Sequence, residues 1–105
     1  MQATERANID LVNDPGDYAI EPAGGWVGYS DDAPLWEHMW FRCPCGCKGR
    51  YRLRLNKPAG ASPPSWDFNR ETVTLHPSVH IQYETRKGTI SHWHGWLQNG
   101  QWVSC

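Results

Sequence analysis

The sequence predicts a mostly β protein, a compact antiparallel sheet or sandwich that carries a zinc-knuckle hairpin and a second hairpin at its C-terminus. Ten glycines and eight prolines interrupt the 105 residues at short intervals, which leaves no room for long helices. Between these breaks, short runs alternate apolar and polar side chains, as in 50–55, and this period of two is typical of strands. The two observations together favour short strands joined by turns.

The same signals place the elements along the chain. Residues 1–25 are polar and acidic, and we expect an N-terminal arm with at most one helical turn within residues 5–12, followed by a single domain at 26–105. An irregular loop is expected at 57–65, where proline, glycine and serine cluster. The predicted strands are 26–29, 38–42, 50–55, 66–69, 72–75, 79–85 and 89–97.

Two hairpins are predicted near the C-terminus. Residues 86–88 are short enough to connect two antiparallel strands, and Asn99-Gly100 is the strongest short signal for a type I′ turn. A two-residue loop at Asn99-Gly100 fixes the pairing of the flanking strands. The expected partners are Gln98 with Gln101, Leu97 with Trp102, Trp96 with Val103, Gly95 with Ser104 and His94 with Cys105.

Clustered cysteines indicate a metal site. Seven tryptophans supply apolar area, yet a domain of this size gains from a further cross-link. Cys43, Cys45 and Cys47 are too close together to close a useful disulfide loop. No secretory signal is recognisable, so we expect a reducing, cytoplasmic setting in which clustered thiols bind metal.

The remaining ligands are expected on the strand at 89–97. Side chains at i and i+2 share one face of a strand, so His92, His94 and Trp96 should lie together. Two or three of the cysteines, His94 and either His92 or Cys105 could then complete a tetrahedral site; a frayed terminal thiol is the simpler interpretation of Cys105. Thiol-rich sites select zinc, and a closed set of four ligands is typical of a structural Zn²⁺.

The charges are distributed unevenly despite a net charge of −1. Residues 1–41 hold eight acidic residues and one basic residue, whereas residues 42–57 hold six basic residues and no acidic one. Arg50, Arg52 and Arg54 should share one face of their strand. This stripe could contact nucleic acid or an acidic partner, although a solvated face is the simpler interpretation.

Three stretches resemble a known family. Residues 41–47 (FRCPCGC), 74–79 (TLHPSV) and 94–100 (HGWLQNG) are similar to the F-x-C-P-C-G-C, T-L-x-P-S-[IV] and H-x-[WF]-[IL]-x-x-G stretches of a small bacterial and phage family of unknown function. The resemblance implies a zinc-binding β-domain with Cys43, Cys45, Cys47 and His94 as matching positions. It also implies relatives that sometimes occur in phage genomes or near bacterial ubiquitin-like conjugation genes. The chain departs from the pattern at Ser91, where relatives often have Cys, and at Lys48, where they often have Gly.

The leading functional prediction is a non-enzymatic protein-binding or adaptor module with a structural zinc and a protein partner, and no association with a membrane. One alternative is a small zinc-dependent hydrolase with an open metal position, which would need a nearby acid or base. The other is a nucleic-acid binder that uses Arg50, Arg52 and Arg54.

Overall fold

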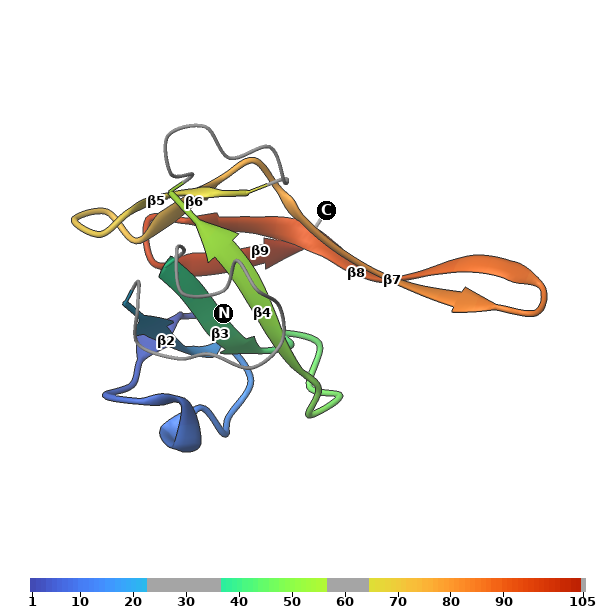
Figure 1. The fold of residues 1–105 in the computed structure, drawn as a ribbon, viewed down its shortest axis with the longest axis horizontal. Helices are drawn as coiled ribbons and strands as arrows, with labels where there is room; N and C mark the ends of the chain where they lie inside the picture. Colours follow the sequence, from blue (N-terminus) through green and yellow to red (C-terminus); the bar gives the residue numbers. More distant parts are fainter. Residues whose placement is uncertain (23–36, 57–64, 105) are drawn as a thin grey trace.

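The computed structural model describes residues 1–22, 37–56 and 65–104, and these ranges are mostly β (Figure 1). The predicted strand at 26–29, most of the predicted loop at 57–65, and Cys105 lie outside them. Within the described ranges, no helix has the length and apolar character needed to span a bilayer. The elements are β1 (Thr4–Glu5), the 3₁₀ turn η1 (Ile9–Leu11), β2 (Asp17–Glu21), β3 (Glu37–Arg42), β4 (Arg50–Leu55), β5 (Asp67–Asn69), β6 (Thr74–His76), β7 (Val79–Thr85), β8 (Gly88–Gln98) and β9 (Gln101–Ser104).

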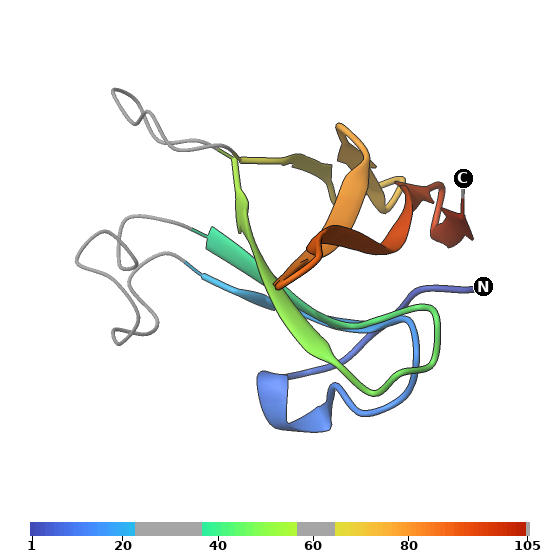
Figure 2. The same cartoon turned by 90° about the vertical axis from the view of Figure 1, so that its right-hand side faces the viewer.

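The strands form three sheets. The largest has the order β1-β2-β3-β4, β5 pairs with β6, and the third has the order β7-β8-β9. All neighbours are antiparallel except β1 and β2, which are parallel. Figure 2 shows the β7–β9 sheet lying over one side of the four-stranded sheet, so their facing sides enclose the core. The predicted mostly β fold is confirmed.

The C-terminal hairpin has the predicted register. Leu97 pairs with Trp102 and Gly95 with Ser104, while Asn99 and Gly100 both adopt positive φ, as a type I′ turn requires. Gly95 leaves no space for a side chain, because a Cβ there would lie 2.2 Å from the carbonyl oxygen of Val103. This close approach brings β9 against the C-terminal end of β8.

The N-terminal segment differs from the expected acidic arm, because β1 and β2 are paired into the four-stranded sheet. Tyr18 is almost fully buried and packs edge-on against Phe68. The neighbouring Asp17 is also buried, and its carboxylate accepts hydrogen bonds from the Arg6 side chain and from the Asp14 backbone N–H. The acidic composition of this segment concealed a strand whose buried carboxylate is neutralised locally.

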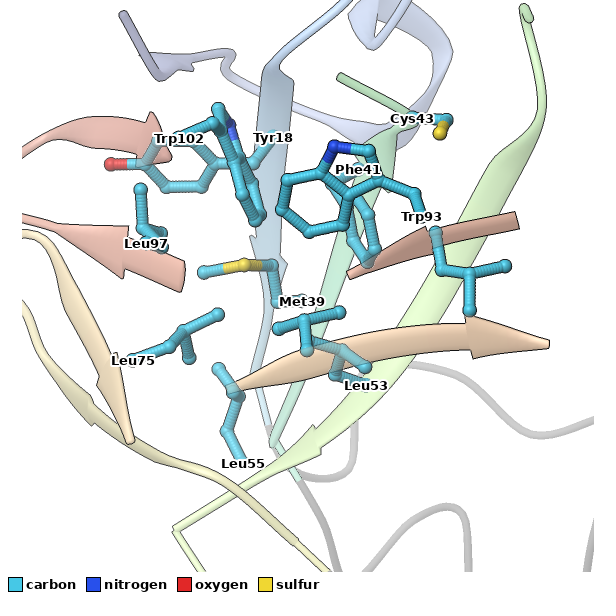
Figure 3. Close-up of a cluster of buried hydrophobic side chains, with 12 residues drawn as sticks. Tyr18, Met39, Phe41, Cys43, Leu53, Leu55, Leu75, Trp93, Leu97 and Trp102 are labelled. Atoms are coloured by element: carbon cyan, nitrogen blue, oxygen red, sulfur yellow. The ribbon is translucent and has the colours of Figure 1, made fainter. Parts of the chain in front are cut away.

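The core lies between the two large sheets (Figure 3). Aromatic rings occupy one end of it: Trp102 stacks on Phe41 with ring centroids 5.1 Å apart and meets Trp93 edge-on at 5.9 Å. The indole N–H of Trp102 donates to the carbonyl oxygen of Gly16, which satisfies its polar atom in the interior. Cys43 is fully buried at the margin of this cluster, so the cysteine turn begins at the edge of the core.

Candidate metal centre and a serine–histidine pair

The turn between β3 and β4 gathers the three cysteines. Its base is closed by the Cys43 N–H, which donates to the Gly49 carbonyl oxygen at 2.9 Å, and the Gly46 N–H donates back to the Cys43 carbonyl oxygen at 3.2 Å. Gly46 and Lys48 have φ values of 90° and 67°, which turn the backbone sharply enough to point neighbouring thiols in one direction. The hairpin predicted around the cysteines is therefore present.

Four potential ligands meet at this turn: Cys43, Cys45, Cys47 and His92. The His92 Nε2 atom lies 3.4, 3.2 and 3.1 Å from the three sulfur atoms in that order, and all four donor atoms lie within 4.8 Å of one another. Ligands of a tetrahedral zinc with bonds of about 2.3 Å are separated by roughly 3.8 Å. The four side chains are thus close enough to bind one metal ion.

The thiol environments fit a site that receives a cation. Burial raises the pKa of the Cys43 thiol to about 12, whereas the Gly49 backbone N–H donates to Cys47 and lowers the pKa of that thiol to about 7. A cysteine binds a metal ion as its thiolate, and a cation beside the sulfur atoms favours this charged form. A bound metal would therefore stabilise as thiolate a buried Cys43 that is otherwise protonated at neutral pH.

A β-bulge determines which histidine reaches the thiols. Ile81 pairs with Trp93 and Gln82 with Ser91, so His92 has no partner on β7 and is the extra residue of β8. Bulges redirect side chains locally. His92 consequently reaches the cysteines and packs against the Tyr83 ring at 5.0 Å, instead of sharing a face with His94 as the strand period predicted.

His94 lies beside a serine. Its Nε2 atom is 3.1 Å from the Oγ atom of Ser78, the residue that precedes β7. Both residues are partly buried, and the Trp66 indole N–H donates to the Ser78 carbonyl oxygen at 3.1 Å. The structure therefore places His94 with Ser78 and brings His92 to the cysteines; Cys105, the other predicted candidate, is outside the described residues.

A second serine–histidine pair adjoins the first. The His80 Nε2 atom is 2.7 Å from the Ser91 Oγ atom, and the His80 ring stacks on His94 with centroids 4.4 Å apart. His80 and His94 are cross-strand partners, so the two pairs lie side by side on one face of β7 and β8. In the described part of the chain, no hydrogen bond joins His94 to a carboxylate; its ring stacks on His80 and lies tilted beside Trp96, with ring centroids 6.1 Å apart.

Ser78 is the functional candidate that reasoning from the sequence missed. The structure pairs Thr85 with Gly88, and without the bulge this register would pair His80 with Trp93 and put His94 on the opposite face from His80. Ser78 and His94 both fall in stretches singled out by the family resemblance, and this was the signal that could have found them.

The basic residues of β4 alternate as predicted, and two of them contact an aromatic ring. The guanidinium groups of Arg50 and Arg52 lie 5.1 and 5.8 Å from the centroid of Trp40, within the range of a cation–π interaction. Arg52 is opposite Trp40 and Arg54 is opposite His38 in the β3–β4 register. Contact of these arginines with nucleic acid stays a prediction.

Comparison with known proteins then gives the family. The family BubE, described as the serine protease of a bacterial ubiquitination-like system, matches residues 14–105. The chain belongs to this family. The range that matches BubE contains the four potential metal ligands as well as Ser78 and His94. No curated protein and no solved structure matches the chain significantly.

Proposed function

We propose that this protein is a serine peptidase in which Ser78 is the nucleophile and His94 is the general base. The observation that carries the proposal is the 3.1 Å separation of Ser78 Oγ and His94 Nε2 in a chain of the BubE family, whose description is that of a serine protease. A serine hydroxyl is weakly nucleophilic unless an adjacent base accepts its proton, and this distance suits that transfer.

The reaction follows from the two atoms. As Ser78 Oγ attacks the carbonyl carbon of the scissile amide, its proton moves to His94 Nε2. Collapse of the tetrahedral intermediate breaks the C–N bond, and His94 returns the proton to the departing amine. Water then attacks the acyl-enzyme, again losing a proton to His94, and the Ser78 hydroxyl is restored when the acid is released.

Ser78 is favoured over Ser91 by its surroundings. Ser91 and His80 are both exposed, whereas Ser78 and His94 are partly buried and Ser78 is anchored through its carbonyl oxygen to Trp66. Partial exclusion of water strengthens the electrostatic interactions on which proton transfer depends. His80 then serves as the stacked neighbour that holds the His94 ring in place.

The metal has a separate role in this proposal. Cys43, Cys45, Cys47 and His92 would hold it, and the sulfur-rich donor set favours Zn²⁺. Four protein ligands close a tetrahedral shell, so the metal would supply a cross-link between the β3–β4 turn and β8. A metal with four protein ligands favours catalysis by the serine–histidine pair. The zinc-dependent hydrolase considered from the sequence would instead require an open position on the metal.

Active-site labelling tests the assignment. The protein is incubated with a fluorophosphonate, and the modified residue is identified by intact-mass and peptide mass spectrometry. We expect a single adduct on Ser78, which S78A and H94A abolish or reduce at least about a hundredfold. S91A is the matched control, because it removes the hydroxyl of the neighbouring pair, and it should label at the wild-type rate.

Two results would overturn the proposal. Labelling at Ser91 instead of Ser78 would mean that Ser91 and His80 are the reacting pair. A folded, metal-loaded protein that no serine-directed reagent modifies would instead support the non-enzymatic binding module predicted from the sequence.

A further inference from the structure

A pocket of about 260 Å³ lies where β4 and β7 face each other. These strands are the terminal members of their sheets among the described strands, so no backbone ladder fills the space between them. One part of its wall is aromatic and aliphatic, and polar side chains complete the lining. The apolar part comprises Phe41, Tyr51, Leu53, Trp66, Val79 and Ile81, and the polar part comprises Arg52, His80 and Gln82. Sites for whole small molecules start at roughly 300 Å³, so this pocket has room for one side chain.

The pocket is linked to the reacting pair at several points. Trp66 forms part of its wall and donates its indole N–H to the Ser78 carbonyl oxygen. Val79, the residue after Ser78, forms another part. His80 also contributes to the lining while stacking on His94. The pocket therefore adjoins the segment of chain that carries Ser78.

We propose that the pocket is the specificity subsite of the peptidase and accepts a branched aliphatic or aromatic side chain adjacent to the scissile bond. This inference rests on the proposed function, because it takes Ser78 as the reacting residue. The aromatic and aliphatic walls gain from burying apolar area. A glycine at that substrate position leaves the apolar part of the lining exposed to water.

Two peptide boronates measure the preference. A boronic acid forms a reversible tetrahedral adduct with an active-site serine. We compare N-acetyl-Ala-Ala-boroLeu with N-acetyl-Ala-Ala-boroGly on the metal-loaded protein. Because a buried leucine side chain contributes favourably to binding, the leucine analogue should bind at least about tenfold more tightly.

Gln82 offers a way to block the pocket without disturbing the core. Its side chain is exposed and contributes to the pocket lining. Q82W should lower the leucine-to-glycine affinity ratio to about one, whereas Q82A, the control at the same position, should leave it near the wild-type value. Equal affinity of the two boronates for the wild-type protein would overturn the inference even if both modify Ser78.

A second measurement separates failure of the subsite from failure of the proposed function. In S78A, N-acetyl-leucinamide is titrated while the indole N–H signal of Trp66 is followed by NMR, with N-acetylglycinamide as the control. A shift with the leucine compound only, abolished by Q82W, supports the pocket independently of catalysis. If the leucine compound shifts the Trp66 signal but the boronates fail to bind, the assignment of the reacting serine is wrong and the assignment of the pocket is supported. If neither compound shifts the signal, the assignment of the pocket is overturned.

Discussion

The two halves of β8 are held in different ways. From Trp93 to Leu97, alternate side chains are buried and pack against the four-stranded sheet and β9. From Gly88 to Ser91, every residue is exposed, and Figure 1 shows this half of the β7–β8 hairpin projecting from the body of the protein. The inner half is therefore stabilised by hydrophobic burial, and the outer half depends on cross-strand pairs.

The boundary between these halves carries the chemistry. His92 lies where burial ends and contacts the three cysteines, and His94 lies one strand period further in, beside Ser78. An exposed hairpin has little apolar area to stabilise it. A metal bound by His92 would hold β8 in place at the position where burial in the core no longer stabilises it.

Removal of the metal should have the largest effect. Structural zinc sites couple binding directly to folding, so exhaustive chelation should lower the free energy of unfolding by several kcal/mol. Hydrogen exchange should show protection lost first at residues 43–49 and 88–92 and retained longer at 39–41 and 93–97. Added Zn²⁺ should restore the protection, and Mg²⁺ is the control. A folded protein with the same unfolding midpoint after complete metal removal would contradict the cross-link.

Truncation of a core aromatic on β9 tests the inner half. Trp102 is 3% exposed, stacks on Phe41 and donates to the Gly16 carbonyl oxygen, so W102A leaves a large cavity and removes this hydrogen bond. We expect a loss of about 3–5 kcal/mol in urea unfolding of the metal-loaded protein. A loss below about 1 kcal/mol would show that the inner half is not held by this cluster.

Loss of one hydroxyl tests the link between the outer half and β4. The Tyr83 hydroxyl lies 2.9 Å from the Tyr51 hydroxyl, so Y83F removes that hydrogen bond and keeps the ring packed beside His92. The expected loss is about 0.5–1.5 kcal/mol in urea unfolding. Y51F removes the same bond from the other side and should match it; a double mutant no worse than either single variant confirms a shared interaction.

The smallest effect is expected at an exposed position of the outer half. Ile90 is 53% exposed and lies opposite Tyr83, so I90T keeps the β-branched shape that a strand favours and removes little buried apolar area. Urea unfolding should change by less than about 0.5 kcal/mol. A change comparable to that of W102A would mean that the outer half is buried against something in solution.

Local signals were enough to predict most of the strands and the C-terminal register. Asn99-Gly100 determines a two-residue loop, and the four described pairs around it follow by counting. The cysteine turn was predictable because three thiols within five residues are too close together for useful disulfides and suit the first shell of a metal. Both features depend on residues close together in the sequence.

The identity of the fourth ligand and of the serine pair could not be predicted in this way. One extra residue at His92 shifts the β7–β8 pairing, and a shift of one residue exchanges the faces of a strand. The period of two treats His92 and His94 as equivalent, whereas the bulge separates them. The strand at 17–21 was missed for another reason: Asp17 is an unusual buried residue, and its partner Arg6 is eleven positions away.

Gly95 has a practical consequence for mapping this site by mutation. It follows His94, and even a methyl group at this position would meet the Val103 carbonyl oxygen at 2.2 Å and the Trp93 ring at 2.8 Å. The backbone of β8 would have to move, and His94 would move with it. In a saturation library selected for activity, substitutions at position 95 would be as damaging as substitutions of a reacting residue, although glycine has no side chain that could contact a substrate. The loss of activity at this position would therefore report how well His94 stays aligned with Ser78.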